Sequence, residues 1–175
     1  MIDAQERVIL LDDSNRPCGT AEKLTAHRLG LRHRAFSVFI VDDAGRILLQ
    51  RRALSKYHSG GLWANTCCGH PRPDEETTSA AERRLREEMG ISTSLVPVGS
   101  FLYHAAVGDA LIEHEYDYLF LGKFDADPQP CPTEVMEWRW ESERETRSRI
   151  AATPRDFAVW LPPALDALRA STIGK

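Results

Sequence analysis

The stretch from residue 69 to residue 91 constrains the fold more than any other part of the chain. Its spacing predicts a helix from about Glu75 to Met89, because Asp74 is a good N-cap residue and Gly90 is a typical stop signal. Apolar side chains recur every fourth residue along one face of this helix, at Ala81, Leu85 and Met89. The remainder of the fold has to bury this apolar stripe.

Two acidic residues at the end of this helix stand in an unfavourable place. Glu87 and Glu88 lie near its C-terminus, where carboxylates oppose the helix dipole. Arg83 and Arg84 precede them by four residues and would form surface ion pairs worth roughly a few tenths of a kcal/mol each. Charged helix faces are common, so this pattern taken alone favours a solvated face over a functional site.

Strand signals surround the helix. Six segments are rich in β-branched and aromatic residues or alternate polar with apolar residues. They are Arg7–Leu11, Ala35–Val41, Arg46–Arg51, Val98–His104, Glu113–Leu121 and Glu134–Trp140. A hairpin turn is expected at residues 42–45, a loop at 125–132 and a second helix near Pro162 to Ala170. Several strands interrupted by few helices predict an α/β (α+β) sandwich with a mixed sheet packed between helices.

Length and composition describe one globular domain over residues 1–175. Of the 175 residues, 42% are hydrophobic and 27% charged, so the chain can bury a core and is not disordered. No apolar run approaches the roughly 20 residues that a membrane-spanning helix needs. The start of the chain, Met1 to Leu11, lacks the basic region and cleavage site of a secretion signal. We therefore expect a cytoplasmic protein with no membrane partner.

The charge balance limits the partners further. The chain has 22 Lys and Arg against 26 Asp and Glu, a net charge of -4, so it lacks a general basic surface for nucleic acid. An anionic ligand would have to meet a local basic cluster. The four cysteines include the adjacent Cys67 and Cys68, a spacing that suits reduced thiols better than a disulfide framework.

Carboxylates and histidines offer candidate ligands. In a strand, Glu113 and Glu115 point to one face and His114 to the other, which implies either a solvated face or a cation shared by the two acids. Three further histidines, with these two carboxylates, would form a mixed nitrogen and oxygen site for a divalent metal: His27, His33 and His70. Spacing alone does not bring them together, and each one alone is more often a surface or core residue.

The segment from Gly69 to Ile91 resembles the Nudix box, a glycine, glutamate and arginine motif of hydrolases that cleave diphosphates. The matching residues are Gly69, Glu75, Arg83, Leu85, Glu87, Glu88, Gly90 and Ile91. Arg84 departs from the motif, because Nudix hydrolases have a glutamate there that helps to hold the catalytic metals, and a cation cannot do that.

Nearly the whole chain resembles the type I isopentenyl diphosphate isomerases, which belong to the Nudix superfamily. The motifs that carry this resemblance are Arg51–Lys56, Trp63–Pro71, Glu113–Glu115 and Ala152–Pro154. Cys67 departs from the pattern by doubling the usual single cysteine, and Trp160 stands near the position of the family's active-site tryptophan. The resemblance implies a Nudix-like sandwich with an N-terminal extension, about residues 1–33, that forms a lid and part of a metal site.

The implied reaction interconverts isopentenyl diphosphate and dimethylallyl diphosphate by protonation and deprotonation through a tertiary carbocation. By the resemblance, Cys68 and Glu115 transfer protons on opposite faces of the double bond, and Tyr103 binds Glu115. Trp160 would face the carbocation, while the diphosphate would be bound by Lys23, Arg52 and Lys56. We expect no flavin, and a monomer or weak dimer.

The resemblance also implies two metal sites. His27, His33, His70, Glu113 and Glu115 correspond to ligands of one divalent metal, which the donor types allow to be Mn²⁺, Zn²⁺ or Mg²⁺. Glu88 and the backbone carbonyl of Cys68 correspond to ligands of a second ion, Mg²⁺, bound to the diphosphate.

Two other functions compete with isomerisation. One is a Nudix diphosphohydrolase, against which Arg84 argues. The other is a non-catalytic module with zinc on Cys67, Cys68 and His70, although structural zinc sites usually space their cysteines two to four residues apart.

Overall fold

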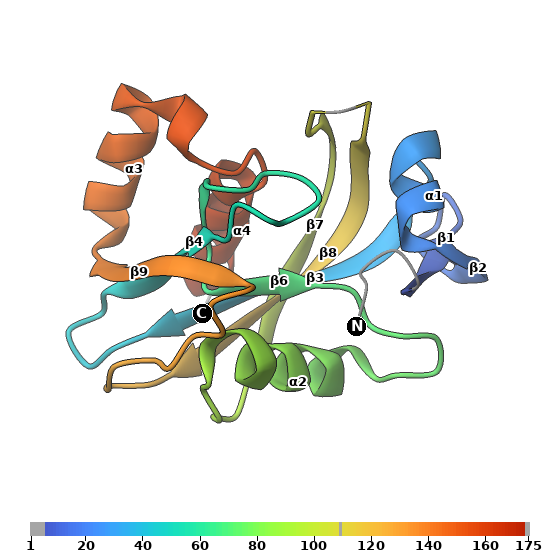
Figure 1. Ribbon diagram of the computed structural model, residues 1–175. Coiled ribbons are helices and arrows are strands. Elements are labelled where there is room, and N and C mark those ends of the chain that lie inside the picture. Colours follow the sequence, from blue (N-terminus) through green and yellow to red (C-terminus); the bar gives the residue numbers. More distant parts are fainter. Residues whose placement is uncertain (1–5, 109, 174–175) are drawn as a thin grey trace.

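A mixed β-sheet lies between helices in the computed structural model, which describes residues 6–108 and 110–173 (Figure 1). The strands are β1 (Arg7–Leu11), β2 (Pro17–Glu22), β3 (His33–Val41), β4 (Ile47–Arg52), β5 (Trp63–Ala64), β6 (Cys67–Gly69), β7 (Val96–Ala106), β8 (Ile112–Lys123) and β9 (Val135–Glu141). The helices are α1 (Lys23–Leu29), α2 (Thr77–Met89), α3 (Glu143–Ala152) and α4 (Leu161–Ile173), with a short 3₁₀ turn at Pro154–Asp156. The predicted α+β sandwich is confirmed.

Strand β3 is the centre of the sheet. It runs parallel to β8 on one side, with His33 opposite Glu115, and antiparallel to β6 on the other, with Ser37 opposite Cys68. Near its end β3 meets β4 at Val41, and β4 then pairs with β5 and β9 instead. The sheet therefore divides into two branches, one centred on β3 and the other on β4.

One apolar core lies between the sheet and α2. The stripe of Ala81, Leu85 and Met89 is fully buried. It packs with Phe36 and Val38 of β3, which point to the same face of the sheet because they are two residues apart. The stripe that the sequence predicts is thus what fixes α2 on this face.

A second core lies on the opposite face, under α4. Phe39 of β3 and Leu119 of β8 pack there with Leu161 and Leu165 of α4. All four side chains are fully buried. Figure 1 shows α2 on one side of the sheet and α3 and α4 on the other, so the sheet is covered on both faces.

The predicted N-cap of α2 is wrong. The helix begins at Thr77 with Glu76 as its cap residue, two positions later than expected, and Asp74 adopts a left-handed backbone conformation with φ of 65°. Glu75 stays outside the helix because its carboxylate accepts two hydrogen bonds from Arg83, at 2.8 and 2.9 Å. This ion pair competes successfully with helix extension.

The predicted end of α2 is confirmed. Gly90 follows the helix with φ of 67°, and a Cβ at this position would lie 2.6 Å from the carbonyl oxygen of Gln129. Only glycine combines this backbone conformation with so close a neighbour.

The six predicted strands are all present, each within two residues of its expected bounds, and the predicted turn at 42–45 and loop at 125–132 are confirmed. The sequence interpretation missed β2, β5, β6, α1 and α3. Strands β5 and β6 have only two and three residues, too few for a periodic pattern, and β2 contains Pro17 and Gly19, which weaken a strand signal. Within the described ranges, no helix is both long and apolar enough to cross a membrane.

Candidate active site

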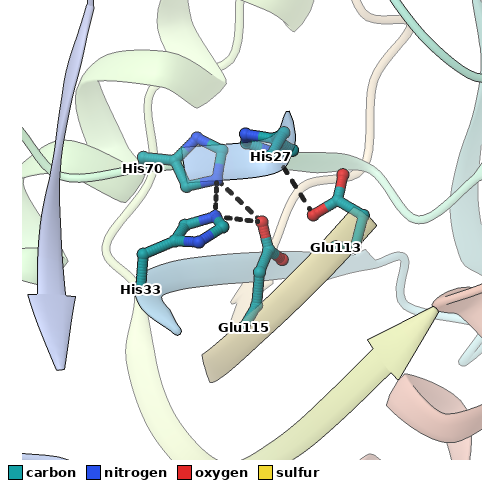
Figure 2. A group of neighbouring side chains, drawn as sticks. All are labelled: His27, His33, His70, Glu113 and Glu115. Atoms are coloured by element: carbon teal, nitrogen blue, oxygen red, sulfur yellow. Dashed lines mark hydrogen bonds and ion pairs between the residues drawn. The ribbon is translucent and has the colours of Figure 1, made fainter. Parts of the chain in front are cut away.

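Five ligand-type side chains converge at one end of β3, although they come from distant parts of the sequence (Figure 2). They are His27 on α1, His33 at the start of β3, His70 just after β6, and Glu113 and Glu115 on β8. Their ligand atoms all lie within 4.8 Å of one another. We call this group the His/Glu cluster.

Hydrogen bonds to the backbone orient two of these rings. Nδ1 of His27 lies 2.7 Å from the Lys23 carbonyl oxygen, and Nδ1 of His33 lies 2.8 Å from that of Leu31. A carbonyl oxygen only accepts, so each Nδ1 carries a proton and each ring turns its Nε2 toward the cluster, where it can offer a lone pair to a metal. This is how proteins orient histidines that bind metals.

The centre of the cluster calls for a cation. Nε2 of His33, with its lone pair, lies 3.2 Å from Oε1 of Glu115, which is also an acceptor. Nε2 of His70 approaches the same oxygen at 2.7 Å and the His33 nitrogen at 3.2 Å (Figure 2). Nitrogen and oxygen atoms this close share either a proton or a cation, and three imidazoles with two carboxylates suit a divalent metal. The residues present therefore fit a metal ion.

Glu115 is ionised in this setting. Its side chain is buried, which opposes ionisation, but the neighbouring His33 imidazole and a hydrogen bond from Tyr103 outweigh burial and lower its pKa to about 2. The Tyr103 hydroxyl donates to Oε2 of Glu115 at 2.5 Å. Tyr103 is brought there by the pairing of β7 with β8, in which it stands directly opposite Glu115.

Cys68 shares a face of the sheet with the cluster. Cys68 lies opposite Ser37 on β3, and Ser37 follows His33 by four residues. Because side chains alternate along a strand, Cys68 points to the same face of the sheet as His33 and Glu115. Burial raises the pKa of Cys68 to about 12, although the charge of Arg52 acts in the opposite direction. Its sulfur is therefore a neutral thiol.

Cys67 points the other way. It lies opposite Val38 and is fully buried in the core beneath α2. Cys67, Cys68 and His70 thus do not face a common point, which argues against the zinc module. In the part of the chain that the structure describes, the group able to hold a metal contains histidines and glutamates and no cysteine.

A basic region lines the same pocket as Cys68 and Glu115. Lys23, Arg52 and Lys56 all contribute to its wall. Lys23 pairs with Glu6 at 3.3 Å and Lys56 with Glu134 at 2.6 Å. These cations come from α1, β4 and the loop after β4, so only the folded chain forms the local basic cluster that an anionic ligand requires.

Trp160 forms part of the pocket wall. It is 2% exposed, and its indole Nε1 donates a hydrogen bond to Oδ1 of Asn65 at 3.1 Å. The guanidinium carbon of Arg52 lies 5.3 Å from the ring centroid of Trp160, within range of a cation–π contact. The ring face is therefore able to stabilise a positive charge.

Glu88 reaches the pocket from α2. Its Oε1 accepts a hydrogen bond from Arg84 at 2.5 Å and its Oε2 one from Gln50 at 3.1 Å. The carboxylate is 4% exposed, so Arg84 supplies the compensating charge that its position near the helix end requires. The solvated-face interpretation of this acidic pair is therefore wrong for Glu88, while Glu87 remains on the outer side of the helix.

The structure brings the proposed site residues together and adds others. His27 and His33 lie in the cluster, and the remaining ones line one pocket: Lys23, Arg52, Lys56, Cys68, His70, Glu88, Tyr103, Glu113, Glu115 and Trp160.

Sequence reasoning missed His58, Asp117 and, as a pocket residue, Arg84. Asp117 follows Glu115 by two residues and therefore shares its face, a signal that was available in the sequence. Its Oδ2 accepts a hydrogen bond from Ser37 at 2.7 Å, and burial together with the charge of Glu115 raises its pKa well above the usual value.

Comparison with known proteins identifies the family of the chain. A model of the NUDIX domain family matches residues 31–161. The isopentenyl-diphosphate Delta-isomerase of Burkholderia multivorans is 51% identical over 156 residues, which cover 89% of both chains. That of Serratia proteamaculans is 49% identical over 155 residues, which cover 89% of this chain and 87% of the relative.

Solved structures share the fold at lower sequence similarity. A Deinococcus radiodurans protein has a TM-score of 0.72 and 21% identity, covering 84% of this chain and 90% of its own. An Ap4A hydrolase of C. elegans has a TM-score of 0.59 and 20% identity, covering 81% of this chain and 98% of its own. At such identities the likeness concerns the fold alone.

Proposed function

The chain belongs to the isopentenyl-diphosphate Delta-isomerase family of Nudix-domain proteins, and on that premise we propose that it interconverts isopentenyl diphosphate and dimethylallyl diphosphate. The observation that carries the proposal is the pairing of a neutral thiol, Cys68, with an ionised carboxylate, Glu115, on one face of the sheet and in one pocket. Moving a double bond by one carbon requires a group that gives a proton and a group that takes one.

The proposed reaction is a proton exchange at two neighbouring carbons. A proton adds to the terminal carbon of the double bond, which leaves a positive charge on the tertiary carbon. A proton then leaves the carbon on the other side, and the electrons of that C–H bond form the new double bond. Cys68 and Glu115 are the two transfer groups, and Tyr103 is the hydrogen-bond partner that lies within 2.5 Å of Glu115.

The His/Glu cluster would hold one divalent metal through His27, His33, His70, Glu113 and Glu115. When bound, the metal supplies positive charge that fixes the Glu115 carboxylate and favours its ionised form. The donor set accepts Mn²⁺, Zn²⁺ or Mg²⁺. Glu88 and the carbonyl oxygen of Cys68 would hold a second ion, Mg²⁺, together with the substrate diphosphate.

The basic cluster would bind the diphosphate. Lys23, Arg52 and Lys56 carry the charge-assisted hydrogen bonds that such an anion needs, and Arg84 adds a fourth cation to the wall of the pocket. With the diphosphate held there, the hydrocarbon part of the substrate extends toward Cys68, Glu115 and Trp160.

Trp160 and the start of the chain would protect the cation. The indole face stabilises a tertiary carbocation, a contact worth about 2 kcal/mol when water is excluded. Glu6 and Lys23 line the pocket from the N-terminal side. We include in the proposal that residues 1–33 act as a lid; residues 1–5 of this segment lie outside the described part of the chain.

Arg84 favours isomerisation over hydrolysis. In the Nudix hydrolase motif this position holds a glutamate that binds metal, whereas here a guanidinium occupies it and hydrogen bonds to Glu88. An arginine cannot ligate the metals that activate water. With an arginine at position 84, Glu88 is better suited to hold Mg²⁺ on an intact diphosphate.

The proposal is tested by proton NMR of isopentenyl diphosphate in D₂O with the enzyme and Mg²⁺. Isomerisation predicts that dimethylallyl diphosphate forms and that no orthophosphate is released. Deuterium should enter the carbon that becomes a methyl group and the carbon that loses a proton. Release of phosphate from a panel of diphosphates, with no dimethylallyl product, would instead establish a diphosphohydrolase. A Cys68→Ala sample run in parallel controls for contaminating enzymes.

A further inference from the structure

His58 lies next to the His/Glu cluster without being one of its members. It follows Lys56 in the loop between β4 and β5, its side chain is 4% exposed, and its Nε2 lies 2.8 Å from Oε1 of Glu113. This is shorter than the 3.5 Å between Nε2 of His27 and Oε2 of the same glutamate. Of His58 and His27, His58 therefore makes the closer contact with Glu113.

The direction of the hydrogen bond follows from its partners. A carboxylate oxygen only accepts, so Nε2 of His58 carries the proton and donates to Glu113. Nδ1 is then the lone-pair nitrogen, and the Ser59 hydroxyl, 3.1 Å away, donates to it. Both ring nitrogens of the neutral imidazole are satisfied in this way.

This tautomer is the opposite of the one in the cluster. His27 and His33 carry the proton on Nδ1 and turn a lone pair inward, as metal ligands do. His58 turns an N–H toward the cluster, which cannot bind a metal. Its chemistry is that of a group that orients a ligand.

The contact distinguishes the two oxygens of Glu113. Oε1 is occupied by the N–H of His58, whereas Oε2 faces His27 at 3.5 Å and the Tyr103 hydroxyl at 3.4 Å. Rotation of the carboxylate would break the bond to His58 and bury its N–H without a partner, which is costly.

The His58 ring is itself held in place. It packs edge-on against Trp160, with ring centroids 5.9 Å apart, and against Tyr57, with centroids 4.3 Å apart. Its backbone carbonyl accepts a hydrogen bond from Arg52 at 3.3 Å. Truncating the side chain leaves that carbonyl, so the effect of the ring is separable from the binding of the diphosphate.

We propose that His58 is a positioning residue that fixes the Glu113 carboxylate so that Oε2 alone is offered to the metal of the His/Glu cluster. The inference rests on the proposed function, because it assumes that this cluster holds a metal. It assigns to the loop between β4 and β5 a part in metal binding that no ligand motif predicts.

The test measures Co²⁺ and Mn²⁺ affinity of the full chain by competition with a chromophoric chelator. His58→Ala should weaken affinity by about 10- to 100-fold, the usual effect of removing a group that orients a ligand. The visible absorption of bound Co²⁺ should change as Glu113 becomes free to rotate. His58→Gln, whose amide N–H still donates, should recover a large part of both signals.

Two measurements separate positioning from a general structural effect. His104→Ala is the matched control, because this histidine packs against His114 on the outer face of the β7–β8 hairpin, and it should leave affinity unchanged. In steady-state assays at a limiting metal concentration, His58→Ala should lower kcat while KM for the diphosphate stays within about twofold, because the Arg52 contact uses the backbone.

The possible results discriminate clearly. Parental Co²⁺ affinity and spectrum in folded His58→Ala would overturn the inference and leave the proposed function intact, provided that the parent binds metal. If the alanine variant does not fold, the same result in His58→Phe, which keeps a ring but has no N–H to donate, would do so. Metal binding that depends on His58 in a protein that isomerises nothing would support the inference and remove the proposed function.

Discussion

Replacing each of the two adjacent cysteines by alanine, one at a time, gives a sharp test of the site. Cys68 pairs with Ser37 and faces the pocket, while Cys67 pairs with Val38 and faces the core beneath α2. Two chemically identical changes, one residue apart, therefore probe opposite faces of one short strand. Cys68→Ala should stop catalysis, and Cys67→Ala should affect stability.

The expected magnitudes follow from these environments. A positioned proton-transfer group contributes about 10²–10⁴-fold to a rate, and Cys68 is one of only two such groups in the proposed reaction. We expect kcat of Cys68→Ala to fall by about 10⁴-fold, which corresponds to roughly 5 kcal/mol of transition-state stabilisation. The pocket retains its cations, so KM should change little.

Cys67→Ala removes one sulfur atom from a fully buried position. The loss of buried apolar contact should lower the free energy of unfolding by about 1–2 kcal/mol, with kcat within about threefold of the parent. Unfolding in urea measures the first quantity, and conversion of isopentenyl diphosphate followed by proton NMR measures the second.

A reversed ranking of the two variants would refute this reasoning. Activity close to the parent in Cys68→Ala would remove the thiol from the reaction, and a large loss of kcat in a folded Cys67→Ala protein would mean that the strand register is wrong by one residue. Cys68→Ser is a useful third variant, because it keeps the size of the side chain and changes its acidity.

Three other predictions follow from the same structure. With a pKa of about 12, Cys68 has about 10³-fold less thiolate at pH 8 than an ordinary thiol. The rate of its alkylation by iodoacetamide, followed by peptide mass spectrometry, should therefore rise about tenfold per pH unit from pH 7 to 10. A plateau of this rate below pH 9 would contradict the prediction. Chelating the metal should lower Tm and expose residues 6–33 to protease, because His27 ties α1 to the cluster; equal cleavage with and without metal would count against it. Arg84→Ala should reduce the free energy of unfolding by about 3 kcal/mol, measured in urea, because it leaves the buried carboxylate of Glu88 without its nearest cation; a loss below 1 kcal/mol would disagree with that account.

Local patterns were sufficient where a feature depends on neighbours in the sequence. The apolar stripe predicted the buried face of α2, and Gly90 its end, because both depend on helix geometry alone. Alternation likewise placed Glu113 and Glu115 on one face of β8. The start of α2 was predicted wrongly because Glu75 is held by Arg83, eight residues away, outside the range of a capping rule.

The site illustrates the limits of pattern reasoning more clearly. Taken from spacing alone, the histidines were weak candidates, and the family resemblance was what identified His27, His33 and His70. His58 matches no ligand motif, and only its contact with Glu113 marks it as part of the site. Arg84 departs from the hydrolase motif in the sequence itself, but its contact with the buried Glu88 appears only in three dimensions.

The amino-acid sequence by itself determined six of the strands, the buried side and the end of α2, and the family to which the chain belongs. The tertiary structure decided which side chains meet. His33 and Glu115 are 82 residues apart and come within 3.2 Å because β3 and β8 pair in one particular register. A shift of that register by one residue would turn Glu115 to the opposite face. Such pairing depends on the packing of the whole sheet, and no local pattern encodes it.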